Sequence, residues 1–196
     1  PYMDVALSAL QIGQPVEGLN TVATDTQSVF FNGKWLADRY RRSGVFVNRM
    51  YLHMVLHCML RHPFKAKRYE GGEALLWDIA CDAAVESIMD DLHYQCLDEG
   101  TIPAKQHFWM QCRKEMPVLT AEGIYRYLKR AQLPEHELKD LWRRFTVDDH
   151  AMWSSAGEDN KSPGAGEQEQ MWSDVADKTM TGMETVFSDN GAAGAA

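Results

Sequence analysis

The alternation of apolar and polar positions predicts a mainly helical chain with a small β element near its start. Apolar residues recur at helical spacing over residues 2–12. β-Branched and aromatic residues dominate residues 21–24 and 28–31, a composition typical of strands. We therefore expect a short helix over the first segment, a hairpin or two edge strands over the other two, and a turn at Asn32-Gly33.

Helical spacing returns beyond this turn. Residues 46–61 are apolar on nearly every side, which is typical of a helix at the centre of its domain. Pro63 predicts the end of that helix, because the residue before a proline is driven out of the α region. A second long helix is expected over residues 73–92, and shorter ones after an N-cap at Thr120 and after Pro134.

The chain changes character after Trp153. The composition shifts to Ser, Gly, Glu, Asp, Asn and Pro, which predicts a linker through Gly166, and six of the eight net negative charges lie beyond Trp153. An amphipathic helical stripe follows the linker and consists of Trp172, Val175, Thr179, Met183 and Val186. We predict one domain over residues 1–153, and an acidic linker with a helical tail over residues 154–196 that leads toward a further domain.

The overall composition is that of a globular protein with one main core. The chain has 196 residues, of which 45% are apolar. Its net charge of −8 argues against nucleic acid or an anionic membrane as a partner. We find no apolar run of about 18 residues and no signal-peptide pattern, so we expect a cytoplasmic protein. The four cysteines lie in helical patterns without a Cys-x-x-Cys pair, which predicts buried thiols.

Two histidines in the central apolar helix are candidate metal ligands. His53 and His57 are four residues apart, so both imidazoles lie on one helix face and could chelate one ion, most simply zinc. Their spacing is that of the zinc-peptidase motif His-Glu-x-x-His, but the second position is Met54. Asp78 and Asp82 have the same spacing on the next long helix, so either could supply a carboxylate if the two helices pack together.

Several alternatives stay open at this point. The two histidines could be ordinary core residues that are satisfied by hydrogen bonds. His150 could become the third ligand if the segment before the linker folds back over the site. His62 lies beside a proline and about 140° around the helix from His57, so we expect it to make a structural hydrogen bond.

The order of the motifs resembles the bacterial putative metallopeptidase domain that is found N-terminal to a von Willebrand factor A-like domain. The resemblance covers about residues 1–155 and rests on the order of several short motifs along the chain more than on any single motif. The pieces are Thr21-Val22-Ala23-Thr24-Asp25, Phe31-Asn32, His53 through Pro63, Trp77-Asp78-Ile79-Ala80-Cys81-Asp82, Ile102-Pro103, Thr120-Ala121-Glu122-Gly123-Ile124-Tyr125 and Asp148-Asp149-His150.

The resemblance implies a zincin-like α+β fold, mainly helical, with a zinc site at His53 and His57. It favours Asp82 as the third ligand, because the family has Asn where this chain has Asp78. The pair Asp78 and Asp82 is also similar to the Glu-x-x-x-Asp of thermolysin-like peptidases, which keeps Asp78 open. The implied partners are the von Willebrand factor A-like domain of the same chain and an AAA-type ATPase.

The departure at Met54 limits the activity that can be expected. The motif Glu moves the proton in zinc hydrolases, and methionine has no group that can do so. We therefore predict a metal-binding domain that is impaired as a peptidase and serves as a binding or assembly module. The alternatives are an active zinc hydrolase with a substitute base such as Glu86 or Glu73, and a metal-free structural interaction domain.

Overall fold

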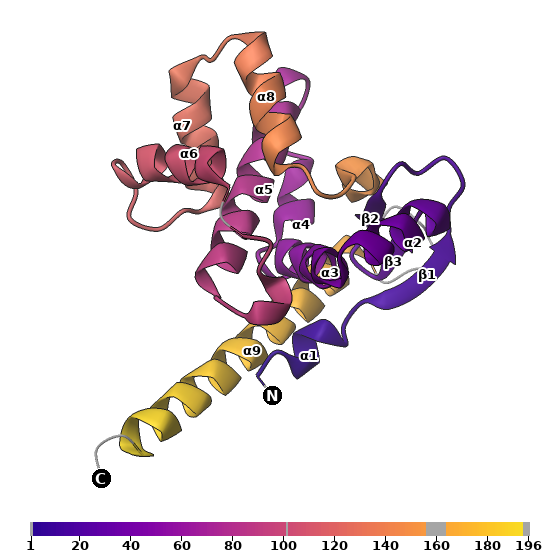
Figure 1. Cartoon of the computed structure of the whole chain (residues 1–196), viewed down its shortest axis with the longest axis vertical. Helices are drawn as coiled ribbons and strands as arrows, with labels where there is room; N and C mark the ends of the chain where they lie inside the picture. The colour runs from indigo at the N-terminus through magenta and orange to yellow at the C-terminus, as the bar shows by residue number, and fades with distance from the viewer. Residues whose placement is uncertain (1, 101, 156–163, 194–196) are drawn as a thin grey trace.

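Two long helices pack against each other at the centre of the molecule (Figure 1). The computed structural model describes residues 2–100, 102–155 and 164–193. The two helices are α3 (Gly44–Met59) and α5 (Gly72–Asp91), and the short helix α4 (His62–Ala66) connects them. α3 is buried along most of its length, as its apolar sequence predicts.

A three-stranded sheet of β1 (Gln11–Pro15), β2 (Val22–Thr24) and β3 (Ser28–Phe31) flanks these helices. β2 and β3 pair antiparallel, which confirms the expected hairpin. β3 is the central strand, however, because β1 pairs parallel with its other side, so the alternative of two edge strands is wrong.

The expected helix over residues 2–12 is also wrong beyond its first turns, since α1 spans only Asp4–Leu7. The Gln11 N–H donates to the Gln27 carbonyl at 2.8 Å, so pairing with a distant strand outweighs the local helical spacing.

The turn expected at Asn32-Gly33 is the start of helix α2 (Gly33–Arg42). The Asn32 side chain accepts a hydrogen bond from the Trp35 N–H at 3.0 Å and caps the helix.

The prediction that Pro63 ends the central helix is wrong. α3 ends at Met59, Arg61 reverses the chain with a φ of 60°, and Pro63 lies in the first turn of α4, where its missing N–H costs nothing.

The C-terminal half supplies a second helical layer over α5. It contains α6 (Pro103–Arg113), α7 (Ala121–Ala131) and α8 (Glu135–Phe145). Two 3-10 turns lie elsewhere: η1 (Gln95–Leu97) contacts α3, and η2 (His150–Ser155) contacts α4 and β2. The Thr120 hydroxyl accepts from the Gly123 N–H at 3.1 Å, which confirms the expected cap of α7. α6 begins at Pro103, because proline is favoured in the first turn of a helix.

The tail helix α9 (Ala165–Ala193) packs against α1 and α3 and runs toward the lower left in Figure 1. Trp172 is fully buried, and its indole N–H donates to the Thr26 carbonyl at 2.8 Å. Trp172 and Val175 share an apolar cluster with Val22 and other residues of the N-terminal region. Residues 156–163 of the predicted linker lie outside the described residues, and the boundary at 153/154 stays a prediction.

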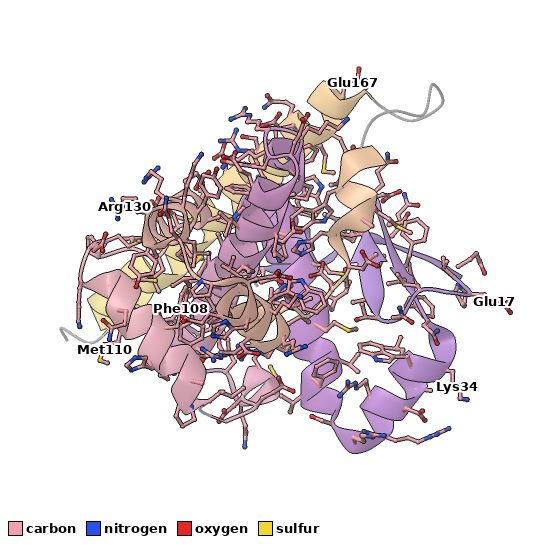
Figure 2. The ribbon with its side chains drawn as sticks, turned by 90° about the horizontal axis from the view of Figure 1, so that it is seen from above. Glu17, Lys34, Phe108, Met110, Arg130 and Glu167 are labelled. Carbon is pink, nitrogen blue, oxygen red and sulfur yellow. The ribbon has the colours of Figure 1, made fainter. Side chains whose placement is uncertain are left out.

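Charged side chains cover the outside of the molecule, as Figure 2 shows for Glu17, Lys34 and Arg130. No described helix is both long and apolar enough to cross a bilayer. All four cysteines are free thiols. Three of them are buried as expected, but Cys96 is exposed, so the prediction is wrong for that residue.

Candidate metal centre

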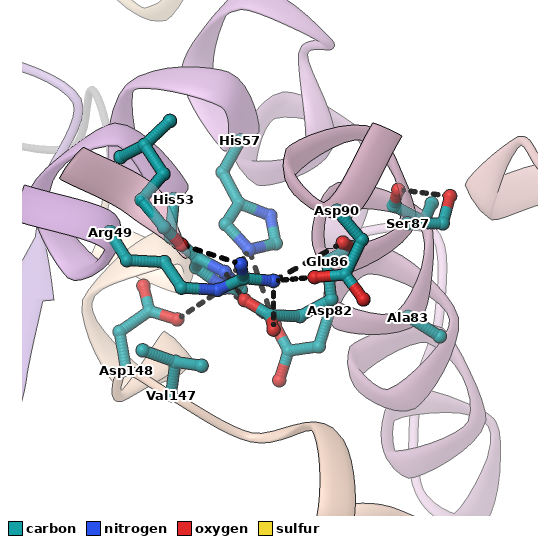
Figure 3. A network of polar contacts seen from close by, with 12 residues as sticks. Arg49, His53, His57, Asp82, Ala83, Glu86, Ser87, Asp90, Val147 and Asp148 are labelled. Carbon is teal, nitrogen blue, oxygen red and sulfur yellow. Dashed lines mark hydrogen bonds and ion pairs between the residues drawn. The ribbon is translucent and has the colours of Figure 1, made fainter. Parts of the chain in front are cut away.

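Four buried side chains from three segments converge at the centre of the molecule (Figure 3). α3 contributes His53 and His57, α5 contributes Asp82, and the segment before η2 contributes Asp148. One donor atom from each of the four lies within 4.8 Å of the others, and none of the four residues is more than 2% exposed. The structure therefore brings together the three residues that the sequence singled out and adds Asp148.

Contacts with the sheet bring Asp148 to the two helices. The Asp149 N–H donates to the Val22 carbonyl of β2 at 2.7 Å. The Thr21 hydroxyl donates to the Val147 carbonyl at 2.9 Å. The main chain on both sides of Asp148 is thus fixed to the start of β2, and its carboxylate reaches His53 from the side opposite α5.

The donor atoms face one another across short distances. His53 Nε2 lies 2.7 Å from His57 Nε2 and 3.3 Å from Asp148 Oδ1. Asp82 Oδ1 lies 3.3 Å from His53 Nε2 and 3.2 Å from His57 Nε2. The second oxygens, Asp82 Oδ2 and Asp148 Oδ2, are buried and have no hydrogen-bond partner among the described residues. So many buried acceptors require a positive charge between them, and this donor set fits a metal cation.

The outer nitrogen of each ring is held by a second partner. His53 Nδ1 lies 3.0 Å from Glu86 Oε1, and His57 Nδ1 lies 2.9 Å from His62 Nδ1. The second contact confirms the structural hydrogen bond expected of His62. With a hydrogen on each Nδ1, and once His53 has lost its second proton, the Nε2 lone pairs would be the ones offered to a metal, as in many metal sites.

Glu86 is tied into a buried ionic network and orients His53 (Figure 3). Its Oε2 accepts from Arg49 Nη2 at 2.9 Å and from Lys105 Nζ at 2.6 Å. Burial raises the pKa of Glu86, but His53, Lys105 and Arg49 outweigh burial and lower it to about 2. Both oxygens are thus engaged, which favours an orienting role over that of a general base. Glu73, the other base that the sequence suggested, accepts from surface Lys129 at 2.6 Å.

The two histidines of the four-residue group differ in charge. Burial and the charge of His53 lower the pKa of His57 to about 4, so its ring is neutral at pH 7. Burial also opposes charge on His53, but hydrogen bonds with Asp148, Asp82 and Glu86 raise its pKa well above the ordinary value. Burial opposes charge on His150 too, but Asp82, Asp148 and Asp78 raise its pKa well above the ordinary value. In the absence of a metal, protons on His53 and His150 therefore supply the positive charge that the carboxylates need.

His150 borders this cluster and is oriented by Asp78. His150 Nε2 lies 3.1 Å from both Asp82 Oδ1 and Asp148 Oδ1, and His150 Nδ1 lies 3.1 Å from Asp78 Oδ1. The segment before the linker does fold back over the site, as the sequence suggested. Asp78 contacts His150 and is not part of the four-residue group. The indole of Trp153 stacks on His150 with 3.6 Å between ring centroids.

Met54 points into an apolar environment. Its side chain is fully buried in the cluster that contains Val22, Val29 and Trp172. It also lines an apolar cavity of about 1130 Å³. The position that carries the catalytic Glu in zinc peptidases is therefore occupied here by a core residue.

A family model described as a putative metallopeptidase domain matches residues 1–192. The chain belongs to this family. No curated protein and no solved structure matches it. Within this putative metallopeptidase domain, the one donor that the sequence did not single out is Asp148. The segment Asp148-Asp149-His150 was the available signal, but spacing along the chain does not show which of its three side chains reaches His53.

Proposed function

We propose that this protein binds one zinc ion through His53, His57, Asp82 and Asp148, in a zincin-like site that does not hydrolyse peptides. The observation that carries the proposal is the group of four buried donor atoms within 4.8 Å of one another. Asp82 Oδ2 and Asp148 Oδ2 also support the proposal, because neither has a hydrogen-bond partner among the described residues. Buried acceptors without a hydrogen-bond partner destabilise a fold unless a cation binds them.

The donor types favour zinc over the common hard cations. Two imidazole nitrogens and two carboxylate oxygens suit a tetrahedral zinc ion, whereas calcium and magnesium prefer six or more oxygens. When bound, zinc supplies Lewis-acid polarisation of an oxygen ligand. His57 would bind as the neutral ring that it already is at pH 7, and His53 would lose a proton to bind.

Three features support the loss of peptidase activity. Met54 has no proton to move, and its apolar surroundings would disfavour a charged replacement. Glu86 is engaged by His53, Arg49 and Lys105. Four protein donors also fill a tetrahedral zinc site, which is typical of structural sites. A binding or assembly role follows, with the von Willebrand factor A-like domain and an AAA-type ATPase as the proposed partners.

Zinc-dependent hydrolysis is the second candidate, and His150 favours it. Its Nδ1 is held by Asp78, and its Nε2 faces the metal centre from the wall of a polar cleft. Asp82 and Asp148 raise the pKa of His150 despite its burial, so Nε2 would take a proton from a water molecule in that cleft only after a bound cation has displaced the proton that the ring holds. This candidate would require one of the four donors to leave a coordination position open.

The test combines metal content with turnover. Chelator-treated protein is titrated with zinc and analysed for bound metal by elemental analysis, then incubated with a broad peptide mixture. We expect about one equivalent of zinc and no zinc-dependent cleavage. The isosteric variant Asp148→Asn is expected to lose most of the bound zinc, whereas His136→Ala on exposed α8 is the matched control and retains it.

Two other outcomes would each favour one of the alternative functions. Less than about a tenth of an equivalent of zinc in the wild type would leave a metal-free interaction domain. Zinc-dependent cleavage that disappears in His150→Asn would establish the hydrolase instead.

A further inference from the structure

A polar cleft of about 800 Å³ opens directly beside the metal centre. Asp148 and His150 are among its lining residues, so a molecule in the cleft would lie next to the four donors. Its walls come from the segment before β2, the α4–α5 connection, α5, the end of α8 and η2. The cleft thus gathers segments that lie more than 100 residues apart in the chain.

Four aromatic side chains line the cleft. They are Tyr69, Trp77, Trp142 and Trp153. Tyr69 stacks on Trp77 with 4.4 Å between ring centroids, which makes a rigid wall. Trp142 is 42% exposed, on a helix whose buried residues are Leu141 and Phe145. Tryptophan is over-represented among residues that anchor a bound partner, so its exposure at a cleft points to a ligand.

The charged lining is mostly acidic. Glu70, Asp78, Asp148 and Asp149 face one lysine, Lys67, together with His150. The Glu70 carboxylate has no hydrogen-bond or ion-pair partner within residues 2–100, 102–155 and 164–193, and it is exposed. Acidic groups between aromatic faces favour a cation with an apolar stem, because the stem packs on the rings while the charged head meets the carboxylates.

Buried polar atoms without partners gather at this cleft. Among the described residues, four of the six such atoms belong to residues that line it: Trp77 Nε1, Trp153 Nε1, Thr146 Oγ1 and Asp148 Oδ2. Trp77 and Trp153 are each only 1% exposed. A ligand in the open cleft does not reach these buried atoms, so the groups that it meets are the exposed aromatic and acidic side chains of the lining.

We propose that this cleft binds an extended peptide segment that carries a lysine or arginine side chain. The basic side chain lies between the aromatic walls with its head toward Glu70 and Asp149, and the peptide backbone runs along the indoles toward His150. The inference rests on the proposed function only in placing the segment beside a bound metal. It assigns the binding role of the domain to a basic stretch of a partner protein.

Fluorescence anisotropy with labelled peptide pools tests the proposal. Hexapeptides with random flanks carry a central Lys, Arg, Gln or Glu, and each pool is titrated with the full chain in the presence and absence of zinc. We expect the Lys and Arg pools to bind about tenfold more tightly than the Gln pool, and the Glu pool most weakly. This preference should weaken as salt is raised.

Two variants separate the cleft from general acidity. Glu70→Gln is expected to weaken binding of the Lys pool about threefold and to leave the Gln pool unchanged. Glu135→Gln is the matched control, because Glu135 is an exposed acid on α8 that pairs with Lys139 and does not line the cleft. Equal binding of the Lys and Gln pools, or equal effects of the two variants, would overturn the proposal.

Two further measurements, competition by a free polyamine and the zinc content of the same protein, identify the source of the cation and separate this inference from the metal proposal. Spermidine that competes as well as the Lys pool would show that the cleft takes free polyamines and would overturn the peptide assignment. Wild-type protein that discriminates the pools but holds no zinc would support the cleft and refute the proposed metal function. Protein that holds zinc without discriminating the pools would refute the cleft alone.

Discussion

At the scale of single residues, Met54 shows that one position can belong to a catalytic motif in sequence and to the core in structure. It follows His53 directly, yet its side chain packs with Val22, Val29 and Trp172 in an apolar cluster. A methionine fits such a site, because its flexible apolar chain fills irregular gaps. The same surroundings make the site a poor one for a carboxylate.

Met54→Glu is therefore expected to destabilise the protein rather than to restore a base. Burial of a carboxyl group without a partner should lower the free energy of unfolding by about 3 kcal/mol, measured by urea denaturation. Met54→Leu is the control and should cost less than about 1.5 kcal/mol, because it keeps volume and polarity. A Met54→Glu protein as stable as the wild type would show that this side chain reaches a polar environment.

At the scale of secondary-structure elements, α9 closes the core that Met54 belongs to. Trp172 and Val175 pack against residues of α1, the sheet and α3, and the Trp172 indole also ties the helix to Thr26. The acidic tail of the sequence is thus in part a structural element. Its buried residues lie on one stripe, as the spacing predicts, with Trp172, Val175 and Thr179 all below 10% exposed.

Trp172→Ala is expected to lower the free energy of unfolding by about 3–5 kcal/mol, because it opens a large cavity and removes a buried hydrogen bond. Met180→Ala on the same helix is the matched control, since Met180 is 54% exposed, and it should change stability by no more than about 0.5 kcal/mol. Thermal or urea unfolding measures both. Similar small effects of the two variants would indicate that α9 detaches in solution.

At the scale of the whole molecule, the candidate metal centre couples stability to pH. Hydrogen bonds with Asp148, Asp82 and Glu86 hold the pKa of His53 well above its ordinary value. The proton on His53 therefore stabilises the metal-free fold below the unfolded pKa of about 6.5, and that contribution is lost as the pH rises through the folded pKa. Zinc must displace this proton, so its own stabilisation should grow over the same interval.

Zinc at about a hundred times its dissociation constant is expected to stabilise the fold by about 2.7 kcal/mol. Unfolding temperatures measured from pH 6 to pH 8 should show an increasing difference between the zinc-bound and the chelator-treated protein. Calorimetry in buffers with different ionisation enthalpies should detect proton release upon zinc binding. Zinc binding that is independent of pH would contradict the assignment of His53 as a ligand that must lose a proton.

The sequence by itself determined the features that depend on neighbours within a few residues. These include the hairpin, the two central helices to within two residues at each end, the Thr120 cap and the shared face of His53 and His57. Local spacing also limited the chemistry, because a methionine at position 54 cannot transfer a proton wherever it lies. Asp82 followed from the spacing of the two acids on α5 together with the family pattern.

Only the tertiary structure decided the features that depend on distant contacts. β1 is a strand because it pairs with β3, and Pro63 begins a helix because Arg61 has already reversed the chain. Asp148 reaches the metal centre because its neighbours are bonded to the start of β2, more than 120 residues earlier. Glu86 orients His53 because α3 and α5 pack side by side. Local sequence sets backbone preferences of a few tenths of a kcal/mol, whereas burial and long-range hydrogen bonds contribute whole kcal/mol and decide where each side chain lies.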